Sequence, residues 1–360
     1  MSYRNVIPGA AKDLAPMLAI ILPMLGFVMA ASPLRAQSPV LTDQSMKSSV
    51  RFQAVSAVSG QVAWISGTRG SWARTLDGGA TWQAGMVPGA DSLEFRDVQA
   101  ASADTAWLLA AGNGDKSRIY KTSNGGRTWS IQFVSTDQRA FFDCIAFWDS
   151  KRGIAISDAV EKDFILLRTE DGGSTWNRVT GLPAAVEGEG LFAASGTCLL
   201  TGSDGFAWFG TGAARTARIG RSLDYGKTWT ITKTPIVQNT TSSGITSLAF
   251  WDTHRGLAVG GDLNVTRERT ANVAISEDGG ATWWPGGNLA FLGPAYGSAV
   301  VPGRSLTAIA VGPGGSAWTT DGGANWQPID TRDYWSVGFA ANGTGWMVGP
   351  AGRIVRVEIR

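Results

Sequence analysis

The chain has 360 residues, and its 31 Lys and Arg residues nearly balance its 29 Asp and Glu residues, giving a net charge of +2 at pH 7. This balance offers no electrostatic case for nucleic-acid binding, and the single histidine, His254, excludes a metal site built from several histidines. Glycine (47 residues) and tryptophan (16) are abundant while only 17% of residues are charged, which favours a secreted all-β protein with many short strands and tight turns.

The first 36 residues have the layout of a secretory signal peptide. Arg4 and Lys12 precede an apolar run over residues 14–31, which is followed by small residues and then by a polar stretch. We therefore expect export, with the mature chain periplasmic or secreted and comprising a single domain over residues 37–360. The alternative is an uncleaved anchor, because about 18 apolar residues can just span a bilayer; any membrane contact is expected only through that segment.

One eight-residue phrase occurs six times, and its fullest copy is TEDGGSTW over residues 169–176. We call each copy a box. Its glycines supply positive φ angles, and its Asp or Asn can accept hydrogen bonds from backbone N–H groups of the same turn, with Ser and Thr hydroxyls as further partners. Each box is therefore predicted to be a hairpin turn held by its own side chains. The acidic or amide residue and the closing tryptophan of the six boxes are Asp77 and Trp82, Asn124 and Trp129, Asp171 and Trp176, Asp224 and Trp229, Asp278 and Trp283, and Asp321 and Trp326.

The boxes follow one another every 43 to 54 residues, which is the length of a four-stranded propeller blade. Within each unit we expect an inner strand, for example over residues 51–58 or 95–100, then a second strand that often carries a tryptophan near its start. A seventh unit, from Asp333 to Val357, ends before any box. Because a three-stranded unit would leave an unpaired edge, residues 39–46 are expected to supply its fourth strand. The predicted fold is all-β, a seven-bladed β-propeller of four-stranded antiparallel blades whose ring is closed by the N-terminal strand.

Three smaller features have structural interpretations. The closing tryptophans are too large to remain in water and are expected in the seams between blades. The phrases AFWDSKRG (residues 146–153) and AFWDTHRG (residues 249–256) are interpreted as polar turns rather than functional motifs. The two cysteines, Cys144 and Cys198, lie about one repeat apart, so they either form a disulfide between adjacent blades or remain two buried thiols.

The six boxes resemble the Asp box, or BNR repeat, with the pattern Ser/Thr-x-Asp-x-Gly-x-Thr-Trp. The departures are Asn124 in the second box, Tyr225 at a common Gly position in the fourth and Asn325 in place of Thr in the sixth. Asp-box propellers include sialidases and other glycoside hydrolases, sortilin-type receptors and the photosystem II stability/assembly factor family. The chain is most similar to the last group, and this resemblance implies a scaffold that binds an assembling partner.

A binding site is expected on the face opposite the boxes, because each box lies on the outer part of a different blade and cannot converge with the others on one ligand. That face is built from the links between blades and from the turns between second and third strands, among them residues 157–164. The links between blades supply the residues expected nearest the central channel, just before the inner strands: Asp97, Asp143, Glu189, Tyr296 and Tyr334. The turn over residues 157–164 adds Asp158 to the predicted binding residues.

The function predicted from the sequence is therefore a non-enzymatic binding or assembly scaffold without a metal or cofactor, whose partner is a protein of the cell envelope or a glycan. The alternative is a glycoside hydrolase, which needs suitably spaced carboxylates or a Tyr/Glu pair. Its candidate catalytic residues are Asp97, Asp143, Asp158, Glu189 and Tyr334. The Arg-Ile-Pro phrase that a sialidase resemblance would call for is absent from the sequence.

Overall fold

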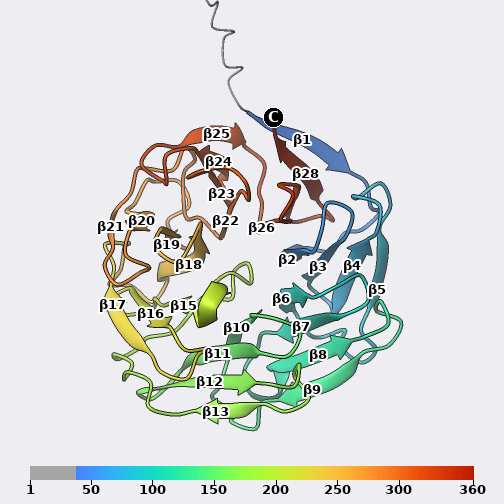
Figure 1. The fold of residues 1–360 in the computed structure, drawn as a ribbon, viewed down its shortest axis with the longest axis horizontal. Coiled ribbons are helices and arrows are strands. Elements are labelled where there is room, and N and C mark those ends of the chain that lie inside the picture. Colours follow the sequence, from blue (N-terminus) through green and yellow to red (C-terminus); the bar gives the residue numbers. More distant parts are fainter. Residues whose placement is uncertain (1–37) are drawn as a thin grey trace, which may run out of the picture. The chain divides into compact units, whose positions relative to one another are not determined.

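The structure, a computed structural model, describes residues 38–360, and the segment predicted as a signal peptide lies outside them. Seven antiparallel four-stranded sheets follow one another around a ring (Figure 1). This arrangement confirms the seven-bladed propeller predicted from the repeat length.

Each blade runs from an inner strand at the axis to an outer strand at the rim, and the strands are grouped below by that position. The inner strands are β2 (Phe52–Ala57), β6 (Phe95–Ala100), β10 (Phe142–Phe147), β14 (Leu199–Thr201), β18 (Ser243–Phe250), β22 (Gly297–Val300) and β26 (Ser336–Phe339). The second strands are β3 (Ala63–Gly67), β7 (Ala106–Ala110), β11 (Gly153–Val160), β15 (Ala207–Gly210), β19 (Gly256–Asp262), β23 (Ala308–Gly312) and β27 (Gly345–Val348). The third strands are β4 (Ser71–Thr75), β8 (Arg118–Thr122), β12 (Asp163–Thr169), β16 (Arg218–Ser222), β20 (Val273–Ser276), β24 (Gly315–Thr319) and β28 (Ile354–Ile359). The outer strands are β5 (Gln83–Met86), β9 (Ser130–Val134), β13 (Asn177–Val179), β17 (Thr230–Lys233), β21 (Trp284–Pro285), β25 (Gln327–Asp330) and β1 (Pro39–Gln44). Two short 3-10 helices, η1 (Gly114–Lys116) and η2 (Ser203–Gly205), lie in turns.

The seventh blade is completed by the N-terminal strand, as predicted. β1 pairs with β28 over its whole length, from Pro39 opposite Ile359 to Gln44 opposite Ile354. Gln44 also joins this blade to the first box, because its amide Nε2 donates to the carbonyl of Gly78 at 2.9 Å while its Oε1 accepts from the indole of Trp346 at 3.1 Å. The ring is therefore closed by strand pairing and by side-chain hydrogen bonds.

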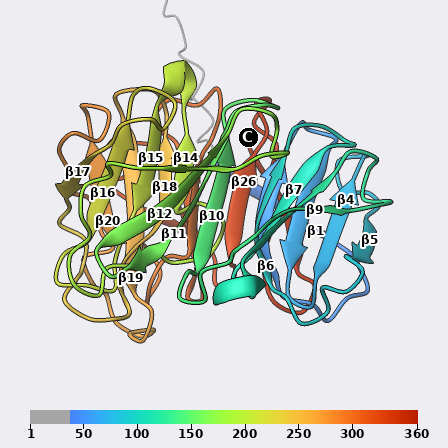
Figure 2. The same cartoon turned by 90° about the horizontal axis from the view of Figure 1, so that it is seen from below.

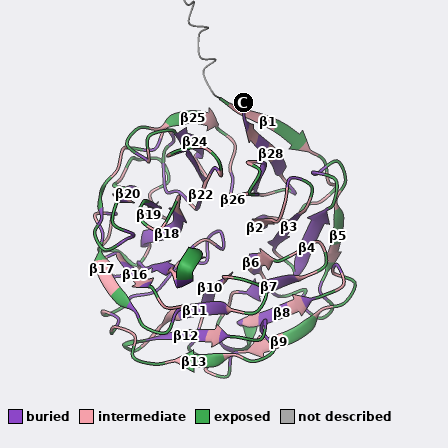
Figure 3. Cartoon of the chain, viewed as in Figure 1, coloured by how far each residue is buried: buried purple, intermediate pink, exposed green. Residues whose placement is uncertain are grey.

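The core is divided among the seams between blades. Seven clusters of buried apolar side chains each combine residues of two adjacent blades. The closing tryptophans of the boxes lie at these seams, as expected: Trp129 of the second blade packs on Trp64 and Trp72 of the first, with ring centroids 6.1 and 5.7 Å apart. Figure 3 shows the consequence, with buried inner strands and exposed outer ones.

The box hairpins satisfy their own polar groups. In the third box, the carboxylate of Asp171 accepts from the backbone and hydroxyl of Thr175 at 2.9 and 2.7 Å and from the hydroxyl of Thr169 at 2.9 Å. Hydrogen bonds from the backbone and side chain of Thr175 lower the pKa of Asp171 to about 2. Asn124 forms the same pattern through its amide group, since its Oδ1 accepts from the Thr128 backbone and its Nδ2 donates to the Thr128 hydroxyl.

Tyr225 in the fourth box replaces a glycine at a position with φ of 60°, which is unfavourable for a residue with a Cβ atom. Its ring packs against Trp148, at 5.5 Å between centroids, and under the guanidinium of Arg152 at 4.0 Å. Both partners belong to the AFWDSKRG turn of the neighbouring blade. That turn is itself held by Asp149, which accepts from the backbone N–H groups of Lys151 and Arg152 at 2.8 Å.

Candidate functional site

The strands run between two faces of the ring (Figure 2). The box face carries the six boxes and the turns between first and second strands. The link face carries the links between blades and the turns between second and third strands, and the predicted binding residues were assigned to it.

The central channel is blocked from the link face by residues 191–197, which we call the plug. This part of the link between β13 and β14 turns into the ring, where Figure 1 shows yellow-green chain inside the circle of inner strands. Its contacts come from several blades: Arg96 donates to the carbonyl of Ala193 at 3.4 Å, Ser336 donates to the carbonyl of Ser195 at 3.0 Å, and Thr197 donates to the hydroxyl of Ser247 at 2.7 Å. The plug therefore touches the second, seventh and fifth blades at the axis.

Both ends of the plug are fastened. At its start the backbone N–H of Leu191 donates to Asp158 Oδ1 at 2.7 Å. Immediately after its end, Cys198 forms a disulfide with Cys144 of β10, with the Cα atoms 6.1 Å apart and both side chains buried. Of the two alternatives for the cysteines, the structure contains the disulfide, and it joins the third and fourth blades.

Two predicted site residues, Asp97 and Asp143, lie within inner strands rather than just before them, and each is only 1% exposed. Asp97 Oδ2 accepts from the backbone N–H of Ile145 in the next blade at 2.8 Å, and burial raises the pKa of Asp97 to about 8. Asp143 occupies an irregular position in the pairing of β10 with β11. Burial, and after it the charge of Asp158, raise the pKa of Asp143 well above its usual value.

Contrary to the prediction, Asp158 does not lie in a turn. The turn expected over residues 157–164 is largely strand, because β11 continues to Val160 and β12 begins at Asp163. Asp158 lies at the shift in register between these two strands. It lines a cavity of about 300 Å³ on the link face together with Glu161, Glu189 and Phe192. Burial raises the pKa of Asp158 to about 6, although the hydrogen bond from Leu191 opposes that rise.

The carboxylate of Glu189 is buried and bonded to neighbouring residues. Its side chain is 0% exposed and forms an ion pair with Arg218, whose Nε donates to Oε1 at 2.8 Å. The hydroxyl of Thr211 and the backbone N–H of Val186 donate to the same carboxylate at 2.6 and 2.9 Å. These contacts hold the turn between β15 and β16 against the link that leads into the plug.

The two predicted tyrosines differ in accessibility. Tyr334 is fully buried, and its hydroxyl donates to Asp330 Oδ2 at 2.8 Å; burial, followed by this hydrogen bond, raises the pKa of Tyr334. Tyr296 is half-buried, and its ring meets that of Trp335 edge-on at 5.0 Å between centroids. Burial, and then the charge of Asp333, raise the pKa of Tyr296.

Tyr296 begins a continuous row of side chains around the plugged mouth of the channel, which we call the mouth cluster: Tyr296, Trp335, Arg51, Glu94 and Arg96. The Arg51 guanidinium lies 4.6 Å from the Trp335 ring and pairs with Glu94 at 3.4 Å. Arg96 pairs with the same carboxylate at 2.8 Å. The side chains of Arg51, Glu94 and Arg96 are 38%, 33% and 30% exposed, so each is held in place while part of its surface faces solvent.

Sequence reasoning missed Arg51 and Glu94. Arg51 was assigned to the first inner strand, which instead begins at Phe52. The available signal was positional, because Arg51 occupies the place before an inner strand that Tyr296 and Trp335 occupy in the sixth and seventh blades.

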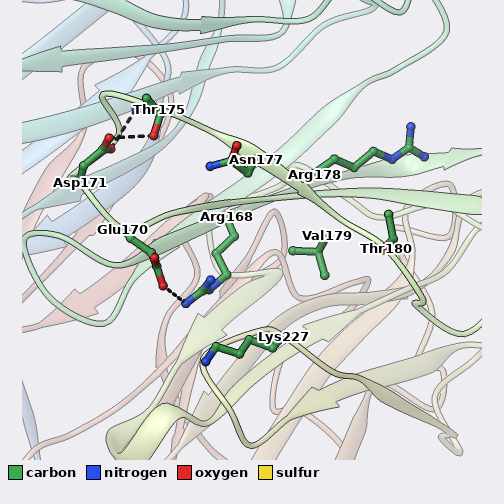
Figure 4. Close-up of a pocket in the computed structure, with 9 residues that line it drawn as sticks. All are labelled: Arg168, Glu170, Asp171, Thr175, Asn177, Arg178, Val179, Thr180 and Lys227. Atoms are coloured by element: carbon green, nitrogen blue, oxygen red, sulfur yellow. Dashed lines mark hydrogen bonds and ion pairs between the residues drawn. The ribbon is translucent and has the colours of Figure 1, made fainter.

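A second hollow lies on the rim between the boxes of the third and fourth blades and encloses about 520 Å³ (Figure 4). Its Arg168 is already committed, since Nε donates to the carbonyl of Tyr225 at 2.8 Å and Nη2 pairs with Glu170 at 2.5 Å. Figure 4 shows Arg178 extending away from Lys227, so these cations do not converge on one point.

Within residues 38–360, no group of three or more His, Cys, Asp or Glu side chains is arranged to hold a metal ion. In the same part of the chain, no helix has the length and apolar character needed to cross a membrane.

No protein-family model and no curated protein matches the sequence. Solved structures do match the fold. A structure described as YCF48 bound to D1 peptide is 15% identical, covers 89% of this chain and 96% of its own, and gives a TM-score of 0.62. YCF48 from Cyanidioschyzon merolae is 14% identical, with coverages of 88% and 98% and a TM-score of 0.60. A streptogramin B lyase is 12% identical, with coverages of 90% and 98% and a TM-score of 0.62. At these identities the likeness shows the propeller fold.

Proposed function

We propose that this chain is an exported, non-enzymatic Asp-box propeller, similar to the photosystem II assembly factor family, that binds a protein partner through its mouth cluster. The observation that carries the proposal is the continuous contact from Tyr296 through Trp335 and Arg51 to Arg96 around the closed end of the channel. Tyr, Trp and Arg are the residues most enriched among those that dominate binding energy at protein interfaces.

The chemistry of the cluster suits a peptide segment or a loop of a partner. Its aromatic rings offer apolar area that costs little side-chain entropy to fix, and its arginines can pair with carboxylates or backbone carbonyls. The pairing of both arginines with Glu94 holds them in position before a partner arrives, which lowers the cost of ordering them. The description of one structural neighbour, YCF48 bound to D1 peptide, gives a peptide ligand for a propeller of this fold and supports the same class of ligand here.

The test is a pull-down from the envelope fraction with the immobilised protein and two variants. Trp335→Ala removes the centre of the mouth cluster, whereas Trp284→Ala removes a tryptophan that is 61% exposed on the outer strand β21. We expect the wild type and Trp284→Ala to recover the same defined partner and Trp335→Ala to recover at most about a tenth as much. Equal recovery by Trp335→Ala would contradict the proposal.

A second candidate function is glycoside hydrolysis at the Asp158 cavity. The observation favouring it is the raised pKa of Asp158, about 6, in a cavity that a sugar ring could enter. The test is a screen against sialosides and plant or microbial glycans. Turnover abolished by Asp158→Asn or Glu189→Gln would replace the scaffold proposal with an enzyme.

A further inference from the structure

The channel remains open on the box face, where the plug turns it into a closed cup. The cup encloses about 530 Å³, within the range of small-molecule sites. Its walls come from the inner strands of six blades and include Val55, Leu200, Phe250, Val300 and Phe339. The end toward the plug is lined by Thr197 and Ser298. The cup is thus a mainly apolar recess with polar residues at its floor, and Ser56, Gln99 and Thr201 add polar groups to its wall.

Among the residues described as lining the cup, no charged side chain is free to pair with a ligand. Asp252 is the charged residue of that lining, and both of its oxygens are used within its own turn. Oδ1 accepts from the backbone N–H groups of His254 and Arg255 at 2.8 and 2.7 Å, and Oδ2 pairs with the Arg255 guanidinium at 2.6 Å. A charged ligand would lose its hydration without gaining a counter-charge, so the lining selects for neutral molecules.

The floor presents a hydrogen-bond donor, the hydroxyl of Ser298. A chain of hydroxyls crosses the channel from Thr197 through Ser247 to Ser298. Ser247 Oγ accepts from the Thr197 hydroxyl and from the Ser298 backbone N–H, both at 2.7 Å, which uses its two lone pairs. Its own hydrogen therefore goes to Ser298, either to Oγ at 2.8 Å or to the carbonyl oxygen at 3.5 Å. Within residues 38–360 the hydrogen of Ser298 has no partner. Ser298 is only 1% exposed but lines the cup, so its hydroxyl can donate to an acceptor placed against the floor.

We propose that the box-face cup binds a neutral small molecule with an aromatic or aliphatic body and a carbonyl or ether oxygen that accepts from Ser298. This site is separate from the mouth cluster, because the plug lies between them. A ligand there would occupy the axis of the ring without competing for the proposed partner-binding face.

The test uses prodan, a neutral naphthalene ketone whose fluorescence reports the polarity and hydrogen bonding around its carbonyl. We expect saturable binding with one site per chain. Ala57→Phe and Ala299→Phe each add a ring at a half-exposed cup residue from a different blade, and each should weaken binding about tenfold or more. Because the two changes are independent, a folding failure in one leaves the other as the test.

Ser298→Ala separates the hydrogen bond from the shape of the cup. We expect it to weaken prodan about three- to tenfold and to shift the bound emission to shorter wavelength, since the carbonyl loses its donor. Trp284→Ala, on the outer rim, should leave both quantities unchanged. Absence of saturable binding, binding unaffected by both ring-adding variants, or an unchanged emission in Ser298→Ala would each overturn the proposal. None of these results bears on the pull-down, which probes the other face.

Discussion

The rim and the axis of this propeller satisfy their polar groups in different ways. At the rim, six boxes repeat one local solution, in which each Asp or Asn finds its partners within about four residues. At the axis, a single non-repeated segment closes the channel toward the link face and depends on partners from distant blades. Repetition thus builds the ring of blades, and the one segment that departs from repetition separates the mouth cluster on the link face from the cup on the box face.

The largest expected effect is a loss of stability when the packing in a seam between two blades is disrupted. Trp107 is 1% exposed, stacks on Phe147 at 4.1 Å and donates to the carbonyl of Gly172 in the third box at 3.0 Å. Trp107→Ala should lower the free energy of unfolding by about 3–5 kcal/mol in urea denaturation. Trp284→Ala, which removes a mostly exposed ring, is the matched control and should change it by less than about 0.5 kcal/mol. Similar losses in both variants would show that the seams do not carry the stability.

The next effect concerns the fastening of the plug. Replacing Cys144 and Cys198 together by alanine opens a loop spanning 54 residues, and we expect a loss of about 2–4 kcal/mol. The wild type treated with a reductant should unfold at the same urea concentration as the double variant. If the reductant destabilises the wild type and the double variant equally, the effect does not come from this disulfide.

The buried carboxyl group of Asp97, near the axis, should make the stability of the fold depend on pH. Its pKa is about 8 in the folded protein, above its usual value near 4, so between these values the folded state binds more protons than the unfolded state. The stabilisation that comes from protonated Asp97 is therefore fully present below about pH 4 and is lost as the pH rises toward 8. Asp97→Asn should reduce the change in the free energy of unfolding between pH 4 and pH 8 by at least about 1 kcal/mol. The measurement is urea denaturation at several pH values, and an unchanged slope would rule out Asp97 as its source.

The rim should respond to pH in the opposite sense and more weakly. Burial acts to raise the pKa of Asp278, but hydrogen bonds from Thr282 and Ser276 outweigh it and lower the pKa below its usual value. This carboxylate therefore stabilises the fold above about pH 4 and loses that contribution as the pH falls. Asp278→Asn copies the natural second box, so it should cost less than about 1 kcal/mol at pH 7. It should also reduce the loss of stability in acid, and an unchanged acid response would assign that loss to other groups.

Much of the frame was predictable because its causes are local. Positive-φ glycines, a carboxylate or amide that accepts from the residue four positions on, and a regular repeat length are all visible in the sequence. The missing outer strand of the last unit was predictable because an unpaired sheet edge is unfavourable. The residues assigned to links and turns were predicted less well. Asp97 and Asp143 lie inside inner strands beside register shifts, and Asp158 lies where irregular pairing carries β11 past its expected end.

The sequence by itself determined the number of blades and the hairpin chemistry of the boxes, because these depend on a simple repeat and on neighbours a few residues apart. It also determined the closure of the ring, because a last unit of three strands would leave an unpaired sheet edge. Only the tertiary structure decided that residues 191–197 enter the channel, that Arg51 and Trp335 meet beside Tyr296, and that Ser298 ends a chain of hydroxyls. These contacts join residues that are tens to hundreds of positions apart. Their geometry is fixed by the closed ring, and no local propensity in the sequence encodes it.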